Sequence, residues 1–124
     1  MLSTGNWCSG IRLTPDGSHV IVAEDEARRL SLFTIDGVFV RCVGLDGIGK
    51  GYKDVLQSVT GEYVVADFHN HRVCVFSPDG SELVRSWGVW GAGDGQFQRP
   101  TALAAAGRHL YVIEFQSGRV QVFE

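Results

Sequence analysis

Three acid–arginine pairs with the same spacing are the most regular chemical feature of the sequence. In each pair an arginine follows an acidic residue after five positions: Glu24 and Arg29, Asp67 and Arg72, Glu114 and Arg119. Such pairs could form a ring of charge that binds a ligand, or they could join the two strands of a hairpin by an ion pair. We favour the structural hairpin pair, because every copy of the repeat described below contains it.

Two histidines at His69 and His71 could offer imidazole ligands to zinc. Zinc sites in proteins use three or four ligands, so two histidines need partners from elsewhere in the chain. The matching positions of the other copies, Glu26 with Arg28 and Gln116 with Gly118, supply no convincing partner. We therefore predict no metal site.

The glycine-rich segments 47–51 and 91–95 resemble loops that bind phosphate groups. Phosphate-binding loops precede a helix whose amino end faces the anion, whereas a strand is expected here from Leu103 onward. Turn geometry is the better explanation of these glycines.

The three cysteines, Cys8, Cys42 and Cys74, are far apart in the sequence, and their odd number indicates reduced thiols. No cysteine or serine lies beside a histidine in a recognisable nucleophile motif, so we predict no catalytic residue and no cofactor.

An internal repeat determines which elements position these residues. Segments 22–33, 65–76 and 112–123 align without gaps, and their last residues, Phe33, Phe76 and Phe123, are 43 and 47 positions apart. Leu13, Leu56 and Leu103 have the same two spacings, which predicts that the register extends into a preceding strand. Asp-Gly pairs at 36–37 and 79–80 indicate tight turns between strands.

The apolar runs of each copy are short, rich in β-branched and aromatic residues, and nearly continuous, as in Tyr63-Val64-Val65. Continuous apolar runs are typical of strands covered on both faces of their sheet. Residues 23–30 have helix propensity, but the matching segments at Phe68 and Phe115 do not, so we expect a hairpin loop in all three copies. Four strands per copy and a period in the forties predict an all-β fold, a segment of a β-propeller with about three four-stranded antiparallel blades.

The residues resemble one known family, the NHL-repeat propellers. Gly91 to Pro100 is similar to the opening motif of that family, and Tyr63 to Asp67 followed by Asn70 to Phe76 is similar to its body. The first copy departs from the motif, because it lacks the asparagine and histidine, and its linker reads Tyr52-Lys53-Asp54. The resemblance implies a propeller that serves as the partner-binding part of a larger protein, as in some ubiquitin ligases.

Antiparallel pairing predicts which loops share one end of the sheets. The Asp-Gly turns lie at one end, and the glycine-rich linkers gather with the hairpin loops at the other, where binding residues are expected. Trp87 is expected to pack between blades, and Trp90 is the better candidate for an exposed anchor. The candidate binding residues of this loop-rich face are Lys50, Tyr52, Phe68, His69, His71, Trp90, Asp94 and Phe115.

The 124 residues suffice for one domain, residues 1–124, with blades at about 11–44, 55–88 and 101–124. Propellers typically close with four to eight blades, so three leave outer faces uncovered and an unpaired strand edge at Val120 to Phe123. We favour a fragment of a longer chain; the alternative is a homodimer that completes a six-bladed ring.

Composition narrows the function classes. The net charge is −3 and the pI is near 5.7, which does not favour RNA binding, and no apolar run is long enough to span a membrane. Without a signal peptide, a cytoplasmic location is expected. The sequence predicts a non-enzymatic interaction module, or scaffold, with a protein partner. The alternatives are a metal-dependent lyase or hydrolase on the same scaffold, and an RNA-binding propeller of the NHL type.

Overall fold

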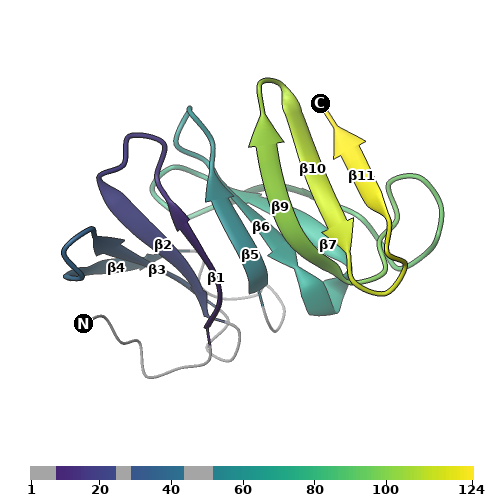
Figure 1. Ribbon diagram of the computed structural model, residues 1–124, viewed down its shortest axis with the longest axis horizontal. Helices are drawn as coiled ribbons and strands as arrows, with labels where there is room; N and C mark the ends of the chain where they lie inside the picture. Colours follow the sequence, from purple (N-terminus) through teal and green to yellow (C-terminus); the bar gives the residue numbers. More distant parts are fainter. Residues whose placement is uncertain (1–7, 25–28, 44–51) are drawn as a thin grey trace.

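The computed structural model describes residues 8–24, 29–43 and 52–124. Within these ranges the chain forms three antiparallel sheets and one short 3-10 helix, η1 (Phe68–Asn70), so the predicted all-β fold is confirmed (Figure 1). The first sheet consists of β1 (Cys8–Leu13), β2 (His19–Glu24), β3 (Arg29–Thr34) and β4 (Phe39–Val43). The second consists of β5 (Tyr52–Gln57), β6 (Tyr63–Asp67), β7 (Arg72–Phe76) and β8 (Leu83–Trp87). The third consists of β9 (Pro100–Ala106), β10 (His109–Glu114) and β11 (Val120–Phe123).

Each sheet follows an up-and-down order in which strands adjacent in sequence are paired. The first strands of the three sheets, β1, β5 and β9, lie side by side (Figure 1). This order separates the connections into two ends. The end with the hairpin loops 68–71 and 115–119 and the linker 88–99 is called the loop face below, and the opposite end is called the turn face.

Two apolar layers, one on each side of the second sheet, form the core. The layer against the first sheet consists of Ile21, Ala23, Leu30, Leu32, Val43, Val55, Tyr63, Val65, Cys74 and Phe76. The layer against the third sheet consists of Leu56, Val64, Ala66, Val73, Val75, Phe97, Leu103 and Val112. Every residue of β6 is buried, because each of its faces is covered. The continuous apolar run of β6 therefore marks a sheet that is covered on both faces, as expected.

The third sheet has an exposed apolar face. Ile113, Val120 and Val122 are 47, 55 and 54% exposed, whereas their counterparts in the second sheet, Ala66, Val73 and Val75, are buried. In the second sheet, these buried residues are covered by the third sheet. The equivalent residues of the third sheet point away from the second sheet, and no described residue covers them. β11 lies at the edge of its sheet, at the position predicted for an unpaired strand.

The expected equivalence of Leu13, Leu56 and Leu103 is wrong by one residue. The paired strands make residues 12, 56 and 104 equivalent, since the partners are Arg12 with Ile21, Leu56 with Val64 and Ala104 with Tyr111. The turn that joins the first two strands becomes shorter in each successive sheet, which shifts the register. Because side chains alternate along a strand, Leu13 and Leu103 both lie on the face opposite to that of Leu56. On the first sheet this face leaves Leu13 58% exposed, whereas on the third sheet it packs against the second sheet and Leu103 is 4% exposed.

The hairpin loops differ in one detail from the expectation of no helical structure. Residues 25–28 of the first loop lie outside the described residues. The second loop contains the single 3-10 turn η1, which ends at His71 with a φ of 53°. The Asn70 side-chain amide donates to the Asp67 carboxylate at 3.2 Å, which closes this turn. The third loop is a turn in which the Gly118 N–H donates to the Glu114 carbonyl at 3.1 Å.

The turn at Gly80 is a contact point between the first two sheets. Its φ is +76°, and its N–H donates to the Ser77 carbonyl at 2.8 Å, so the Asp-Gly pair forms a tight turn as predicted. A Cβ atom at Gly80 would lie 2.7 Å from Cβ of Val43, which belongs to the first sheet. Glycine is thus required here for its conformation and for the close approach of the two sheets.

We expect Gly80→Ala to destabilise the protein by about 3 kcal/mol, since it combines the cost of a positive φ with overpacking against Val43. Gly17→Ala is the matched control, because Gly17 has a similar φ of +74° and no atom within 4 Å of the added Cβ. Its cost is about 1 kcal/mol. Urea unfolding of the two variants measures the difference. Equal free energies of unfolding would contradict the proposed contact between the sheets.

Candidate interaction site on the loop face

The three acid–arginine pairs form ion pairs across their hairpins. The Nε atom lies 2.8 Å from the carboxylate in the pairs Glu24–Arg29 and Asp67–Arg72, and 2.6 Å in Glu114–Arg119. The three acidic side chains have no exposed surface, whereas the arginines are 24 to 33% exposed. A buried carboxylate requires such a partner, because the desolvation of an unpaired charge is costly.

Each buried carboxylate has a second partner that the sequence analysis missed. The donors are the Ser31 hydroxyl to Glu24, the Cys74 thiol to Asp67 at 3.8 Å, and the Gln121 amide to Glu114 at 3.0 Å. These donors occupy the same position of each copy, seven residues after the acid. That spacing was available as a signal in the repeat alignment. The repeat therefore encodes a three-residue polar unit inside each blade.

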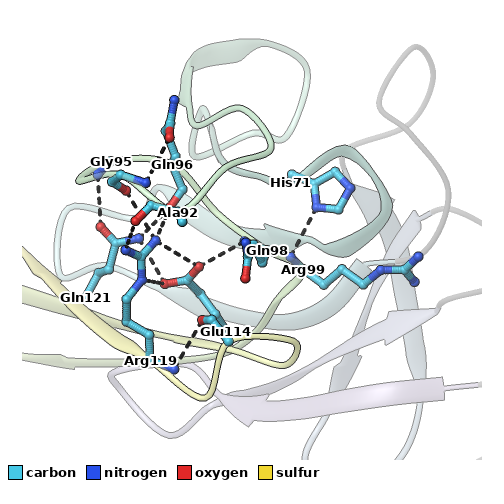
Figure 2. Close-up of polar contacts among 11 residues, drawn as sticks. His71, Ala92, Gly95, Gln96, Gln98, Arg99, Glu114, Arg119 and Gln121 are labelled. Atoms are coloured by element: carbon cyan, nitrogen blue, oxygen red, sulfur yellow. Dashed lines mark hydrogen bonds and ion pairs between the residues drawn. The ribbon is translucent and has the colours of Figure 1, made fainter.

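The third unit also holds the glycine-rich linker in place, as Figure 2 shows. Arg119 donates from its Nη atoms to the carbonyls of Ala92 and Gln96, the latter at 2.8 Å. The Gln121 side chain accepts the Gly95 N–H at 2.9 Å and donates to the Gln96 carbonyl at 2.6 Å. The linker thus folds over the third hairpin, and its glycines serve a turn, as the sequence analysis favoured.

Hydrogen bonding determines the charge state of Glu114. Burial by itself would raise the pKa of this carboxyl, but the hydrogen bonds from Arg119, the Gln98 backbone N–H and Gln121 together hold the pKa below its ordinary value. The hydrogen bond to Glu114, together with the negative charges of Glu114 and Asp94, raises the pKa of Arg119. Glu114 is therefore ionised at neutral pH, and its charge is used within the fold.

An exposed cluster of aromatic and basic side chains lies beside this network. The Arg99 guanidinium carbon is 5.3 Å from the centroid of the Phe68 ring, a cation–π distance. The ring centroid of Phe68 is 6.1 Å from that of Phe115 and 5.0 Å from that of His69. Phe68 is 8% exposed and Phe115 is 69% exposed, so Phe68 forms the buried base of the cluster and Phe115 part of its surface.

His71 connects Trp90 to this cluster. Its Nδ1 accepts the Arg99 backbone N–H at 3.1 Å (Figure 2), and its ring meets the Trp90 ring edge to face at 6.4 Å. His71 and Arg99 have φ values of 53° and 64°, the only positive φ values of non-glycine residues in the described part of the chain. We call the continuous surface of Phe68, His69, His71, Trp90, Arg99 and Phe115 the loop-face patch.

The structure brings together five of the eight predicted binding residues, namely Phe68, His69, His71, Trp90 and Phe115. Asp94 is exposed in the linker, outside the patch. Lys50 lies outside the described residues, and Tyr52 begins β5. Sequence reasoning missed Arg99, although this cation stands in the linker motif directly before Pro100.

Metal binding and thiol chemistry depend on how the His, Cys, Asp and Glu side chains are grouped and buried. Among the described residues, no group of three His, Cys, Asp or Glu side chains lies close enough to hold a metal ion. Burial raises the pKa of the Cys74 thiol to about 12, so it remains protonated. Over the same part of the chain, no helix has the length and apolar character that crossing a bilayer requires.

Comparison with known sequences identifies an NHL repeat. The NHL repeat family model matches residues 57–76. This range begins at the last residue of β5 and includes all of β6, the second hairpin loop and β7. The chain is 35% identical over 77 residues to RING finger protein nhl-1 of Caenorhabditis elegans, a match that covers 62% of this chain and 8% of that protein. The resemblance to NHL-repeat propellers is therefore confirmed.

Comparison with solved structures identifies the fold as a β-propeller segment. Hydrazine synthase of Kuenenia stuttgartiensis matches 94% of this chain with a TM-score of 0.70 at 18% identity, over 34% of its own length. Glutaminyl cyclase of Myxococcus xanthus matches 94% with a TM-score of 0.67 at 18% identity, over 47% of its length. Virginiamycin B lyase of Staphylococcus aureus with quinupristin matches with a TM-score of 0.63 at 14% identity, over 44% of its length. This chain therefore spans less than half the length of each of these three proteins.

Loss of one hairpin arginine tests the structural role of the pairs. We expect Arg72→Ala to lower the free energy of unfolding by about 3 kcal/mol, because the Asp67 carboxylate would remain buried without its charged partner. Arg108→Ala is the control, since Arg108 is exposed and makes no ion pair within the described residues; its effect stays within about 0.5 kcal/mol. An unchanged melting temperature of Arg72→Ala would refute the hairpin-pair role.

The protonation of His71 provides a second test. Burial, followed by the nearby charges of Arg99 and His69, lowers the pKa of His71 below its ordinary value of 6.5. The folded state therefore binds this proton less readily than the unfolded state, and the free energy of unfolding decreases as the pH falls from 6.5 toward the pKa of the folded state. NMR titration of the imidazole measures the shift. A His71 that titrates at or above the ordinary value would contradict the burial of its imidazole beside Arg99.

Proposed function

We propose that this propeller segment with its NHL repeat is a non-enzymatic interaction module that binds a protein partner through the loop-face patch. The observation that carries the proposal is the exposure of Trp90 and Phe115, at 60 and 69%, in the same patch as Arg99. Tryptophan, tyrosine and arginine are the residues most enriched among the hot spots of protein interfaces.

The backbone beneath the patch supports this role, because it is fixed before any partner binds. Arg99 and His71 are joined by a hydrogen bond, and the Phe115 N–H donates to the Arg99 carbonyl at 2.9 Å. The neighbouring Gln116 N–H donates to the Gln98 carbonyl at 3.2 Å. Loops held in this way lose little conformational entropy on binding, which favours affinity.

The chemistry of the patch indicates the kind of partner. Arg99 makes no ion pair with a carboxylate in the described part of the chain, so its guanidinium can pair with an acidic side chain. Phe115 and Trp90 offer exposed apolar surface within the same patch. A peptide segment that combines an acidic residue with large apolar residues complements these groups. The proposal places this binding in the cytoplasm, where free thiols such as those of Cys8, Cys42 and Cys74 remain reduced.

The two alternative functions, a lyase or hydrolase and an RNA-binding propeller, have less support. The likeness to the lyase concerns the fold alone, at 14% identity. An RNA-binding surface would need several cations for phosphate groups, whereas the patch has one arginine.

The exposed face of the third sheet would gain a neighbour in either of two ways: two copies associate into a six-bladed ring, or the segment belongs to a longer chain. Both arrangements are compatible with the proposed binding face.

Selection of peptides from a displayed random library against the folded chain tests the proposal. We expect the selected peptides to contain acidic and aromatic residues, and Arg99→Ala or Phe115→Ala to weaken their binding by about tenfold or more. Ile35→Ala, at an exposed position of the turn face, is the control and is expected to leave the affinity unchanged within about twofold. Peptides that bind all variants equally would refute the patch. Tight, salt-sensitive binding of oligouridine would favour the RNA alternative instead.

A further inference from the structure

A cavity lies between the second and third sheets, away from the loop-face patch. It has a volume of about 640 Å³ and is reached between the β5–β6 and β9–β10 turns of the turn face. Small-molecule sites in proteins commonly have volumes of about 300 to 1,000 Å³. The walls are mostly apolar and include Leu56, Val64, Val75, Leu110 and Phe123.

The cavity results from two differences between successive copies of the repeat. At the corresponding place between the first and second sheets, Tyr63 and Gln57 form a cross-strand pair, and Tyr63 is 1% exposed. The equivalent pair of the third sheet is Leu110 and Ala105. Tyr63 is buried in its layer, whereas the smaller Leu110 and Ala105 line an open space in theirs.

Trp87 supplies an aromatic ring to the wall of this cavity. Its indole ring lines the space and packs against Phe123 at a centroid distance of 5.5 Å. The indole Nε1 is buried and has no hydrogen-bond partner in the described part of the chain. Because this atom is closed off from the open space, a ligand in the cavity would contact the indole ring and not Nε1.

Two arginines supply unused positive charge at the same cavity. Arg85 lies on β8 of the second sheet, Arg108 lies in the turn before β10 of the third sheet, and both line the space. Neither guanidinium forms an ion pair or hydrogen bond within the described residues. The acidic residue at the cavity, Glu124, lies 3.9 Å from His109, which also lines the space.

We propose that this cavity binds a small amphipathic carboxylate, such as a medium-chain fatty acid. The counter-ion that Arg85 and Arg108 lack is a carboxylate, and the apolar walls of the cavity fit a hydrocarbon tail. The apolar tail packs against Leu56, Val64 and Val75, which are buried residues of the second sheet. This site is separate from the protein-binding patch and does not depend on that proposal.

Titration of the chain with decanoate tests the site, with decanol as the uncharged probe of equal length. We expect saturable binding in which decanoate binds about tenfold more tightly than decanol, together with a shift of the Trp87 indole Nε1–H signal in the NMR spectrum. Replacing Arg85 and Arg108 together by glutamine is expected to remove the preference for decanoate and to leave decanol binding unchanged. Equal affinity of the two probes for the original chain would overturn the proposal.

Ala105→Leu tests the location of the site, because it places a larger side chain in the cavity at the position where the second sheet carries Gln57. We expect this variant to weaken decanoate binding by about tenfold or more. Ala104→Leu is the matched control, since Ala104 is the adjacent residue of β9 and does not line the cavity. Its decanoate affinity should remain within about twofold of the original. Absence of saturable decanoate binding, or equal loss in both variants, would refute the assignment.

Discussion

Burial of both faces of the second sheet is the interaction on which the rest of the structure depends. A four-stranded sheet of apolar residues is not stable alone in water, and here each face of that sheet is covered by a neighbouring sheet. The close approach of Gly80 to Val43 shows how tightly the first two sheets meet. The second sheet therefore fixes the positions of the loops at both ends of the stack.

Buried polar units connect this packing to the loop face. The carboxylates of Glu24, Asp67 and Glu114 lie inside the blades, so each must be neutralised by its arginine and hydrogen-bonded by a second side chain. In the third blade the same residues extend outward to the linker, which leads to Arg99 and Trp90. Repeated scaffold residues thus place a surface of aromatic and basic groups that occurs once in the described chain.

Differences between the copies, rather than their common residues, create both candidate sites. At the loop face, His71, Trp90 and Arg99 meet because the second hairpin loop and the second linker carry these residues. Between the second and third sheets, Leu110 and Ala105 replace the larger pair that fills the first layer. A repeat protein gains its individual binding surfaces in this way, since the shared residues are committed to stacking the blades.

The sequence by itself determined the period, the antiparallel strands, the covered sheets and the pairing of each acid with its arginine, because these depend on residue patterns within one copy. It failed for Leu13, where one extra turn residue reversed the face of the side chain, and it passed over Arg99 and the open layer at Ala105. Only the tertiary structure decided these points. They depend on how loops of different length meet and on how side chains from two sheets fill the space between them, and neither is encoded in the local pattern of a single copy.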